Sequence, residues 1–400
     1  MSDLAAGVGR SYDAVPYDGG AQDGLALTEV RGAAVALGFA PTPGAVLDVL
    51  DVGCGMGAQL FQAAQHSTGR MVGIDASATA CAEARARGAG LGERWQILHG
   101  DAALFEPGGL DPAVLGQFDV IYVIGTLYIV PAGARARMLA GLAGLLKPGG
   151  VVVMNYYTGV VGLARTRLGR LLHAQNDPGW PVERQVATAR GNLQAVADAV
   201  PDAGVTREIV MATLAGMVGS SDTVLFHEAL GQVFDTLLTA DIEAVLAPFG
   251  VSFVNYMPPA PVRPEAGSRA AAQAADAWDF ATGGGYRVAL FGRGGVAGAG
   301  LRHPDLLWST TLQPAPARDG IACFSDKQRG VGLRTPELLL QAAVECLIAA
   351  PRDWAGLRVA VRGWLALRGL APPEEAAFDA AVAQLLLLMW SGKVARPALG

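Results

Sequence analysis

The stretch from Ala45 to Gly57 constrains this chain most, because it joins a strand to a helix through a turn of alternating glycines. Its sequence is Ala-Val-Leu-Asp-Val-Leu-Asp-Val-Gly-Cys-Gly-Met-Gly. The apolar, β-branched run predicts a strand, and the residues from Ala58 to Ala64 predict a helix. Gly53, Gly55 and Gly57 allow backbone angles that other residues avoid, and without a Cβ they let a ligand approach the main chain. The sequence therefore predicts a cofactor-binding turn.

This turn fits two cofactors. Gly53-x-Gly55-x-x-Ala58 matches the dinucleotide fingerprint, in which a pyrophosphate lies at the helix N-terminus and an acid about 20 residues further on binds the ribose. Such an acid is present, because the segment from Arg70 to Asp75 predicts a second strand that ends in a carboxylate. That carboxylate can accept hydrogen bonds from both ribose hydroxyls of either cofactor. An NAD-dependent dehydrogenase is therefore one interpretation.

Later segments favour another interpretation. Trp95 to Ala102 predicts a third strand that ends in Gly-Asp-Ala, and Gln117 to Ile124 predicts a fourth. Leu146-Lys147-Pro148-Gly149-Gly150 then precedes a fifth strand. With Asp51 at the end of the first strand, this order of motifs resembles class I S-adenosylmethionine-dependent methyltransferases. The resemblance implies an α/β fold with a Rossmann-like seven-stranded sheet and S-adenosyl-L-methionine as the cofactor.

The same resemblance implies cofactor contacts residue by residue. Asp75 is expected to bind the ribose and Asp101 the adenine amino group, so both carboxylates should face one groove. The other expected contacts lie at the strand ends and in the N-terminal arm, and they are Tyr12, Tyr17, Gln22, Asp51, Gly53, Cys54, Gly55, Ala76, Ala102, Ile124 and Gly125.

The N-terminal arm has a tyrosine on each side of a proline, in Tyr12-Asp13-Ala14-Val15-Pro16-Tyr17. From composition alone, the arm is either a lid over the ligand or a segment packed on the surface. With Gln22 it resembles the opening of bacterial methyltransferases that carry a regulatory domain, a group that includes the rickettsial-type protein lysine methyltransferases. Asn155-Tyr156-Tyr157-Thr158-Gly159 and Leu225-Phe226-His227-Glu228 resemble two further motifs of that family.

One segment departs from the family. Where the family has His-Gly-x-Tyr-x-Trp-Val-Pro after the fourth strand, this chain has Ile124-Gly125-Thr126-Leu127-Tyr128-Ile129-Val130-Pro131. The histidine and tryptophan are missing, and the aromatic residue is displaced by one position. The acceptor of the methyl group can therefore differ from the lysine of the family.

Methyl transfer to an amine requires the neutral amine, because an ammonium has no lone pair. At neutral pH, deprotonating an amine with a pKa of about 10.4 costs about 4.6 kcal/mol. Tyrosine and asparagine oxygens can orient the amine, and aromatic rings attract its positive charge. We therefore predict Tyr128, Asn155 and Tyr157 as catalytic residues and Tyr128, Tyr156 and His227 as acceptor-binding residues.

Each candidate also has a purely structural interpretation. Tyr128 can be packing at the edge of the sheet. Tyr156 and Tyr157 alternate across a strand end, so one faces the cleft and the other faces the core. His227 lies beside apolar residues on a predicted helix, where a core or capping role is more common. Glu228 is more often a solvated helix charge than a catalytic base.

The chain is predicted to have four parts. Residues 1–40 form an N-terminal arm or lid, and residues 41–157 with 249–293 form the cofactor-binding core. Residues 158–248 are expected to be a helical regulatory or substrate-binding insert over the cleft, with helices from Pro181 to Val200 and from Asp222 to Leu238. After a glycine-rich linker, residues 301–400 are expected to form a helical, winged-helix-like domain with helices at 336–350, 354–368 and 374–391.

Composition limits the partners. The 400 residues carry a net charge of −6, with a pI near 5.4, which gives no basic footprint for nucleic acid. Four scattered cysteines indicate no metal site and no disulfides. Without a secretory signal or an apolar run of about 20 residues, the chain is expected in the cytoplasm and away from membranes. The apolar run from Leu385 to Trp390 is expected in a core or at the interface of a homodimer.

The sequence thus predicts a methyltransferase that acts on an amine, with a lysine of a protein or peptide as the first choice. A small-molecule N- or O-methyltransferase is the alternative among enzymes. A cofactor-binding scaffold without catalytic activity is the alternative from another class.

Overall fold

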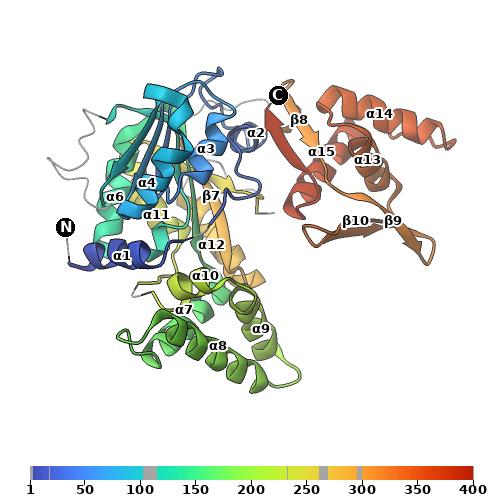
Figure 1. Cartoon of the computed structure of the whole chain (residues 1–400). Helices are drawn as coiled ribbons and strands as arrows, with labels where there is room; N and C mark the ends of the chain where they lie inside the picture. The colour runs from blue at the N-terminus through green and yellow to red at the C-terminus, as the bar shows by residue number, and fades with distance from the viewer. Residues whose placement is uncertain are drawn as a thin grey trace. The chain divides into compact units, whose positions relative to one another are not determined.

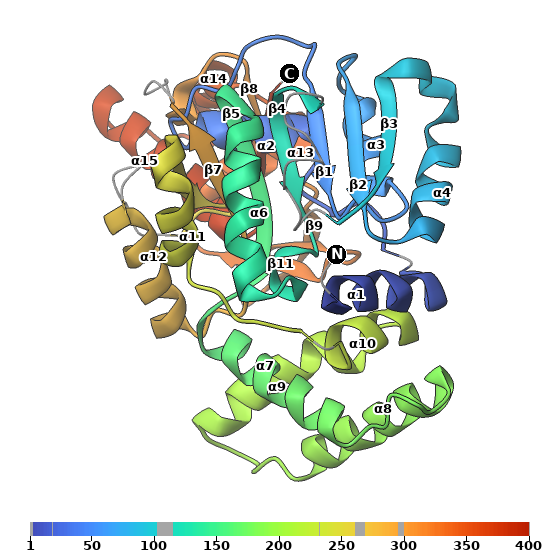
Figure 2. The same cartoon turned by 90° about the vertical axis from the view of Figure 1, so that its left-hand side faces the viewer.

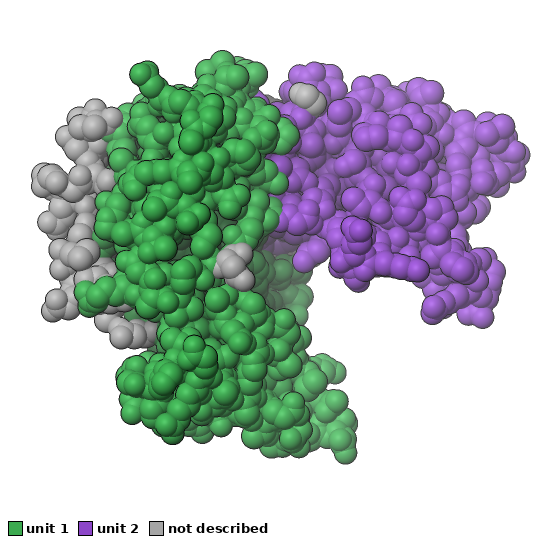
Figure 3. All heavy atoms as spheres, in the orientation of Figure 1, with its two compact units in different colours: residues 1–22, 42–253, 262–294 green, residues 23–41, 254–261, 295–400 purple. Residues whose placement is uncertain are grey.

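The computed structural model describes residues 3–17, 19–101, 115–231, 233–260, 269–294 and 300–399. Contacts between residues divide the chain into two compact units, which Figure 3 colours separately. Unit 1 comprises residues 1–22, 42–253 and 262–294, and unit 2 comprises residues 23–41, 254–261 and 295–400. Within the described ranges, no helix is long and apolar enough to cross a membrane.

The main sheet has seven strands in the order β3-β2-β1-β4-β5-β7-β6. Figure 1 shows the whole chain, and Figure 2 labels all of these strands except β6. The pairs along β3-β2-β1-β4-β5 are parallel, whereas β7 runs antiparallel to β5. All residues of β1 and β4 are buried, as expected for parallel strands that are covered on both faces. The strands are β1 (Val49–Val52), β2 (Met71–Asp75), β3 (Trp95–His99), β4 (Phe118–Val123), β5 (Leu146–Tyr157), β6 (Val251–Tyr256) and β7 (Tyr286–Arg293). The predicted Rossmann-like seven-stranded sheet is confirmed.

Helices that follow the strands pack on the sheet, and Figure 2 shows α6 and α11 in front of it. Ser77 begins one of them, because its side chain accepts a hydrogen bond from the Ala80 N–H at the N-terminus of α4. The elements are α1 (Asp3–Ala14), α3 (Ala58–Ala64), α4 (Ala78–Arg87), α6 (Ala132–Leu145), α11 (Thr239–Leu246) and α12 (Arg269–Thr282), with short 3-10 helices η1 (Ala89–Arg94), η2 (Leu127–Ile129) and η3 (Ala247–Phe249).

Four helices lie between β5 and α11 in the sequence. They are α7 (Gly159–Ala174), α8 (Val182–Asp198), α9 (Val205–Val218) and α10 (Asp222–Ala229). Their apolar positions meet in a small core that contains Leu172, Val186, Leu193 and Leu214. As the sequence predicts, α8 begins after Pro181 and ends before Pro201, because proline is tolerated only in the first turn of a helix.

The predicted helix from Asp222 to Leu238 is wrong beyond Ala229. A Cβ on Gly231 would lie 2.5 Å from the carbonyl oxygen of His227, so the chain turns tightly there. It then runs beside the main sheet, where the Asp235 and Leu237 N–H groups donate to the Tyr128 and Tyr157 carbonyls at 2.9 and 2.8 Å. These tertiary hydrogen bonds replace those that a longer helix would make.

Unit 2 contains helices and two small sheets. Its elements are α2 (Leu27–Ala36), η4 (Gly300–Arg302), β8 (Leu306–Ser309), β9 (Gln313–Arg318), β10 (Ile321–Asp326), β11 (Val331–Thr335), α13 (Leu338–Ala349), α14 (Trp354–Ala366), α15 (Glu375–Ser391) and β12 (Arg396–Leu399). The three predicted helices are present within a few residues of their expected bounds. The apolar run on α15 contributes Leu386, Met389 and Trp390 to the core of this unit.

The contact division differs from the predicted domains at the N-terminus. Residues 23–41 group with unit 2 rather than with the rest of the arm. A Cβ on Gly32 would lie 2.6 Å from the Ala398 Cα, so α2 packs closely against β12. Arg396 also pairs with Asp23 and Glu29, at 2.9 and 2.6 Å. These contacts join segments far apart in the sequence, which no local pattern reveals.

Candidate active site

The glycine turn connects β1 to α3 through three residues with positive φ. Gly53, Gly55 and Gly57 have φ of 73°, 50° and 75°, a region that favours glycine. A Cβ on Gly53 would lie 2.0 Å from the Thr126 Oγ1 atom, whereas a Cβ on Gly55 would meet no atom within 4 Å. Gly53 is therefore needed for packing, and Gly55 leaves the main chain open to a ligand.

Two carboxylates lie near the carboxyl ends of β1 and β2, where Asp51 is buried and Asp75 is partly buried. Asp75 accepts hydrogen bonds from the Gly55 N–H and the Ser77 N–H, both at 2.8 Å, which ties the end of β2 to the glycine turn. Burial raises the pKa of Asp75, although these N–H groups act in the opposite direction. Burial, together with the charge of Asp75, raises the pKa of Asp51 to about 7. Both acids are thus held in a poorly solvated place.

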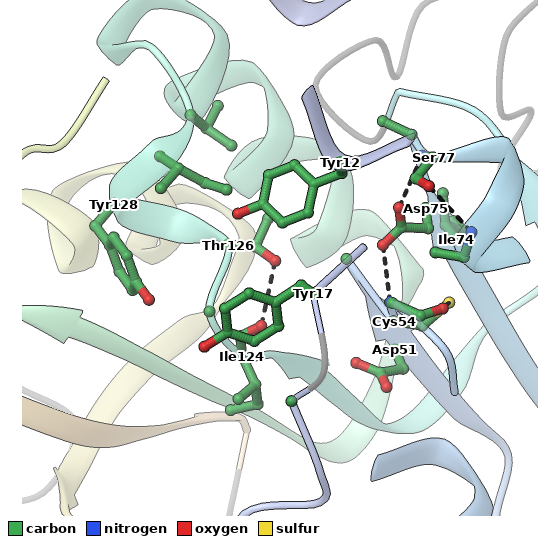
Figure 4. A pocket seen from close by; sticks show the side chains of 18 of the residues that line it. Tyr12, Tyr17, Asp51, Cys54, Ile74, Asp75, Ser77, Ile124, Thr126 and Tyr128 are labelled. Carbon is green, nitrogen blue, oxygen red and sulfur yellow. Dashed lines mark hydrogen bonds between the residues drawn. The ribbon is translucent and has the colours of Figure 1, made fainter. Parts of the chain in front are cut away.

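A cavity of about 490 Å³ opens at the carboxyl ends of the parallel strands, where ligands bind in such sheets. Figure 4 shows Asp51 and Asp75 on one side of it, Tyr128 on the other, and Tyr12 and Tyr17 between them. The described residues of the predicted cofactor set all line it, namely Tyr12, Tyr17, Gln22, Asp51, Gly53, Cys54, Gly55, Asp75, Ala76, Asp101, Ile124 and Gly125. Ala102 lies outside the described residues.

The loop after β4 forms one wall of the cavity. Gly125 has a φ of 74°, and its N–H donates to the Asn155 Oδ1 atom at 2.7 Å. The Asn155 amide nitrogen donates to the Gln22 Oε1 atom at 3.3 Å and to the Tyr286 hydroxyl. Asn155 is fully buried behind this wall. It therefore holds the loop in place rather than facing the ligand.

The end of the cavity around Tyr128 is aromatic. The Tyr128 and Tyr157 rings lie 5.0 Å apart, and the Tyr157 and Tyr286 rings are also 5.0 Å apart. All three line the cavity. Burial raises the pKa of Tyr128 and Tyr157, and it raises that of Tyr286 to about 12. At neutral pH these groups are therefore neutral hydroxyls that can donate and accept hydrogen bonds.

A carboxylate lies among these tyrosines. Glu228 of α10 lines the cavity, and its two oxygens accept hydrogen bonds from the Tyr17 hydroxyl at 3.2 Å and the Tyr157 hydroxyl at 3.1 Å. The Arg165 Nη2 atom lies 2.6 Å from the Glu228 Oε2 atom. The charged network thus combines the N-terminal arm, β5, α7 and α10. We call Tyr17, Tyr128, Tyr157, Tyr286 and Glu228 the tyrosine end of the cavity.

The N-terminal arm crosses the cavity and contacts both sides of it. Asp13 accepts hydrogen bonds from the Ser77 hydroxyl at 2.7 Å and the Thr79 N–H at 3.0 Å, at the start of α4. On the other side, the Tyr12 ring stacks on the His227 ring of α10 at 3.8 Å. The His227 Nε2 atom lies 2.6 Å from the Val15 carbonyl oxygen. These contacts favour the interpretation of the arm as a lid over that of a surface segment.

Two predicted acceptor residues lie away from the main cavity. Tyr156 is fully buried in the core, where its hydroxyl lies 2.8 Å from the Thr239 Oγ1 atom. The strand alternation that the sequence predicts is therefore present, and Tyr157 is the residue that faces the cavity. His227 is buried behind Tyr12 and lines a smaller cavity of about 220 Å³.

Two residues of the tyrosine end are not among the predicted site residues. For Glu228, the sequence favours a solvated helix charge over a catalytic base, but its side chain is only 16 % exposed. Tyr286 begins β7 and pairs with Tyr157, because antiparallel β7 starts where parallel β5 ends. An aromatic residue at the first position of the last strand is the signal that could have identified it.

Comparisons with known proteins agree with this geometry. Residues 49–150 match a family model described as "Methyltransferase domain". The structure is similar to that of PKMT2 from Rickettsia typhi, with a TM-score of 0.71 and 16 % identity over 96 % of this chain and 78 % of that chain. It is also similar to PKMT2 in complex with AdoHcy, with a TM-score of 0.72 and 15 % identity over 96 % and 77 %. At such identities the structural likeness shows a shared fold.

The residues present fit the cofactor of this fold. Asp75 and Asp101 line one cavity, as a ribose and an adenine amino group require, and Gly55 leaves an open approach to the main chain. A cavity of about 490 Å³ lies within the range for small-molecule sites, about 300–1,000 Å³. The chain is therefore an S-adenosylmethionine-dependent methyltransferase with the class I fold.

Proposed function

We propose that this methyltransferase acts on an amine, and that a lysine side chain of a protein or peptide is its acceptor. The observation that carries the proposal is the tyrosine end of the cavity, where a carboxylate lies among aromatic rings. Aromatic faces attract cations, and hydroxyls that are fixed by a carboxylate can accept hydrogen bonds from the N–H groups of an amine. Such a surface suits an amine better than a hydroxyl acceptor.

The cofactor would be held at the other side of the cavity. Asp75 would accept hydrogen bonds from the ribose hydroxyls with its remaining lone pairs, and Asp101 would accept one from the adenine amino group. Tyr12 and Tyr17 of the arm would cover the ligand and exclude water. When bound, the cofactor would supply a methyl group on a sulfonium, toward which the residues of this chain would direct the lone pair of the amine.

At the acceptor side, Tyr128 and Tyr157 would orient the amine. The Tyr157 hydroxyl donates its hydrogen to Glu228, so its lone pairs are free to accept an N–H from the amine. A fixed acceptor for each N–H directs the nitrogen lone pair toward the methyl group, and such positioning accounts for much of the rate in displacement reactions. Asn155 supports the wall beside them through Gly125.

Lysine is the first choice for two reasons. The arm, the Asn155 motif and the Leu225–Glu228 motif resemble those of the rickettsial-type protein lysine methyltransferases, and residues of all three segments border this cavity or its wall. The structural neighbour is named PKMT2. A small-molecule amine is the second candidate, because the segment from Ile124 to Pro131 departs from the family pattern and supplies Tyr128.

Incubation of the purified protein with methyl-labelled cofactor tests this proposal. We expect label to appear on lysine-containing peptides or proteins, and mass spectrometry should place it on a side-chain nitrogen. Label on small amines alone would favour the second candidate. A protein that binds S-adenosylhomocysteine yet labels no acceptor would be a scaffold, and binding of NAD instead would revive the dehydrogenase interpretation. The predicted homodimer and cytoplasmic location stay predictions.

A further inference from the structure

Arg165 is a buried cation that lies behind the tyrosine end of the cavity. Its side chain is 5 % exposed, and its Nη2 atom lies 2.6 Å from the Glu228 carboxylate. Its guanidinium also lies over the Tyr157 ring, 4.7 Å from the centroid, and 5.3 Å from that of Phe234. Burying an arginine costs desolvation free energy unless its charge is paired, and Glu228 is the partner here. Arg165 is not among the residues that line the cavity, whereas its contact partners Glu228 and Tyr157 both line it.

Arg165 is the charged partner of Glu228, and the acids Asp51 and Asp75 line the same cavity on the side of the glycine turn. His227, beside it on α10, is neutral at neutral pH, because burial lowers its pKa. The tyrosines around the carboxylate are neutral hydroxyls. Further away, Arg135 pairs with Asp235 at 2.6 Å, and Arg190 of α8 pairs with Asp222 at the start of α10, also at 2.6 Å. Arg137 of α6 lies at the exposed rim of the cavity.

This balance matters for an amine, which must lose a proton before it can accept a methyl group. An uncompensated carboxylate within about 4–6 Å would hold that proton, since an opposite charge at such a distance favours the charged form by about 1–3 pH units. Each unit lowers the neutral fraction about tenfold. A carboxylate alone would therefore bind the ammonium well and slow its methylation.

We propose that Arg165 keeps the acceptor amine able to lose its proton, by cancelling the charge of Glu228 while leaving that carboxylate to fix the Tyr17 and Tyr157 hydroxyls. This inference rests on the proposed function, because it requires an amine acceptor. Arg165 is a positioning residue here, since it acts through Glu228 and touches no substrate. The Arg165–Glu228 pair fixes the hydroxyls that would bind an amine. Because the pair carries no net charge, it would not stabilise the protonated form of that amine.

The test is a pH–rate profile with a lysine-containing peptide, from about pH 6 to 10, for four variants and the wild type. In Arg165→Met, we expect the midpoint of the rising limb to move up by about one unit or more. At about pH 7.5, kcat should then fall about tenfold or more, while KM for the peptide also falls. Arg165→Lys keeps the charge and should keep the wild-type midpoint.

Glu228→Gln provides the opposite perturbation. It leaves Arg165 uncompensated, so the midpoint should move down and KM for the peptide should rise. The double variant Arg165→Met with Glu228→Gln should return the midpoint toward that of the wild type, which a purely structural effect would not do. Titration with S-adenosylhomocysteine checks that each variant is folded and binds the cofactor product.

The outcomes separate the two proposals. If the wild type is active and the midpoints of the pH–rate profiles are unchanged in Arg165→Met and in Glu228→Gln, the role of Arg165 is rejected and the proposed function stays intact. Shifts of the same sign in both variants would also reject it. A wild type that methylates no amine would reject both proposals together.

Discussion

Asp75→Asn tests the cofactor half of the site most directly. Asparagine keeps the size of the side chain and one carbonyl acceptor, but it removes the charge and one pair of acceptor sites. In the structure, Asp75 already accepts the Gly55 and Ser77 N–H groups, one on each oxygen, so the second lone pair of each oxygen is left for a ribose. The substitution is therefore expected to weaken both the hydrogen bonds that hold the glycine turn and the binding of the ligand.

The magnitude follows from the hydrogen bonds that would be lost. A hydrogen bond to a charged group contributes about 1.5–3 kcal/mol. Loss of one such bond and weakening of the other gives about 2–4 kcal/mol, or roughly 30- to 1,000-fold in the dissociation constant. Isothermal titration with S-adenosylhomocysteine measures this change without catalysis.

Asp119→Asn is the matched control. Asp119 is a buried acid at the start of β4, at the opposite end of the strands, where it pairs with Lys147 at 2.8 Å. Its loss should lower thermal stability and leave affinity for the cofactor product within about threefold. If Asp75→Asn folds and binds within threefold of the wild type, the ribose assignment of Asp75 is wrong.

Three further predictions concern other residues of the site. The pKa of Asp51 is about 7 in the folded state against about 3.8 in the unfolded state, so between these pH values the folded state binds a proton on Asp51 that the unfolded state has lost. The free energy of unfolding of the wild type should therefore fall as the pH rises from about 4 to 7. Asp51→Asn removes that dependence, and its advantage in Tm over the wild type should grow across this range and then level off. Tyr128→Phe should lower kcat about tenfold or more and leave cofactor affinity unchanged, as steady-state kinetics and titration will show; equal kcat would make Tyr128 a packing residue. Asn155→Ala leaves the Gly125 N–H without its acceptor and should weaken cofactor binding by about 1–3 kcal/mol, whereas an unchanged dissociation constant would show that the loop holds itself.

The residues that line the cavity on the side of the glycine turn could be predicted, because their signals are local. A strand, a glycine turn and a helix are adjacent in the sequence, and the acids at the ends of β1, β2 and β3 meet at one edge because parallel strands share their direction. The resemblance to class I methyltransferases also reached the seven-stranded sheet. It did not reach the strands of unit 2, where β9 contains two prolines that argue against a strand.

The tyrosine end of the cavity could not be predicted in the same way, because it is assembled from segments that are distant in the sequence. Glu228 and Arg165 are 63 residues apart, and Tyr17 is 211 residues from Glu228. The pairing of Tyr157 with Tyr286 depends on the antiparallel register of β7. Alternation on β5 indicates that either Tyr156 or Tyr157 faces the cavity, but the choice depends on the tertiary packing of Tyr156 against Thr239.

This division of the site has a consequence for specificity. The residues expected to hold the cofactor belong mainly to the sheet and its loops, whereas Glu228 and Arg165 come from the helices between β5 and α11. A change in those helices can therefore alter charge at the tyrosine end without moving Asp75 or the glycine turn. The arm is the exception, because Tyr12 contacts α10 while Asp13 contacts α4. Because the arm contacts both α10 and α4, closure of the cavity depends on both of these helices. An acceptor that displaces Tyr17 from Glu228 would therefore also be expected to move the arm away from the cofactor side of the cavity.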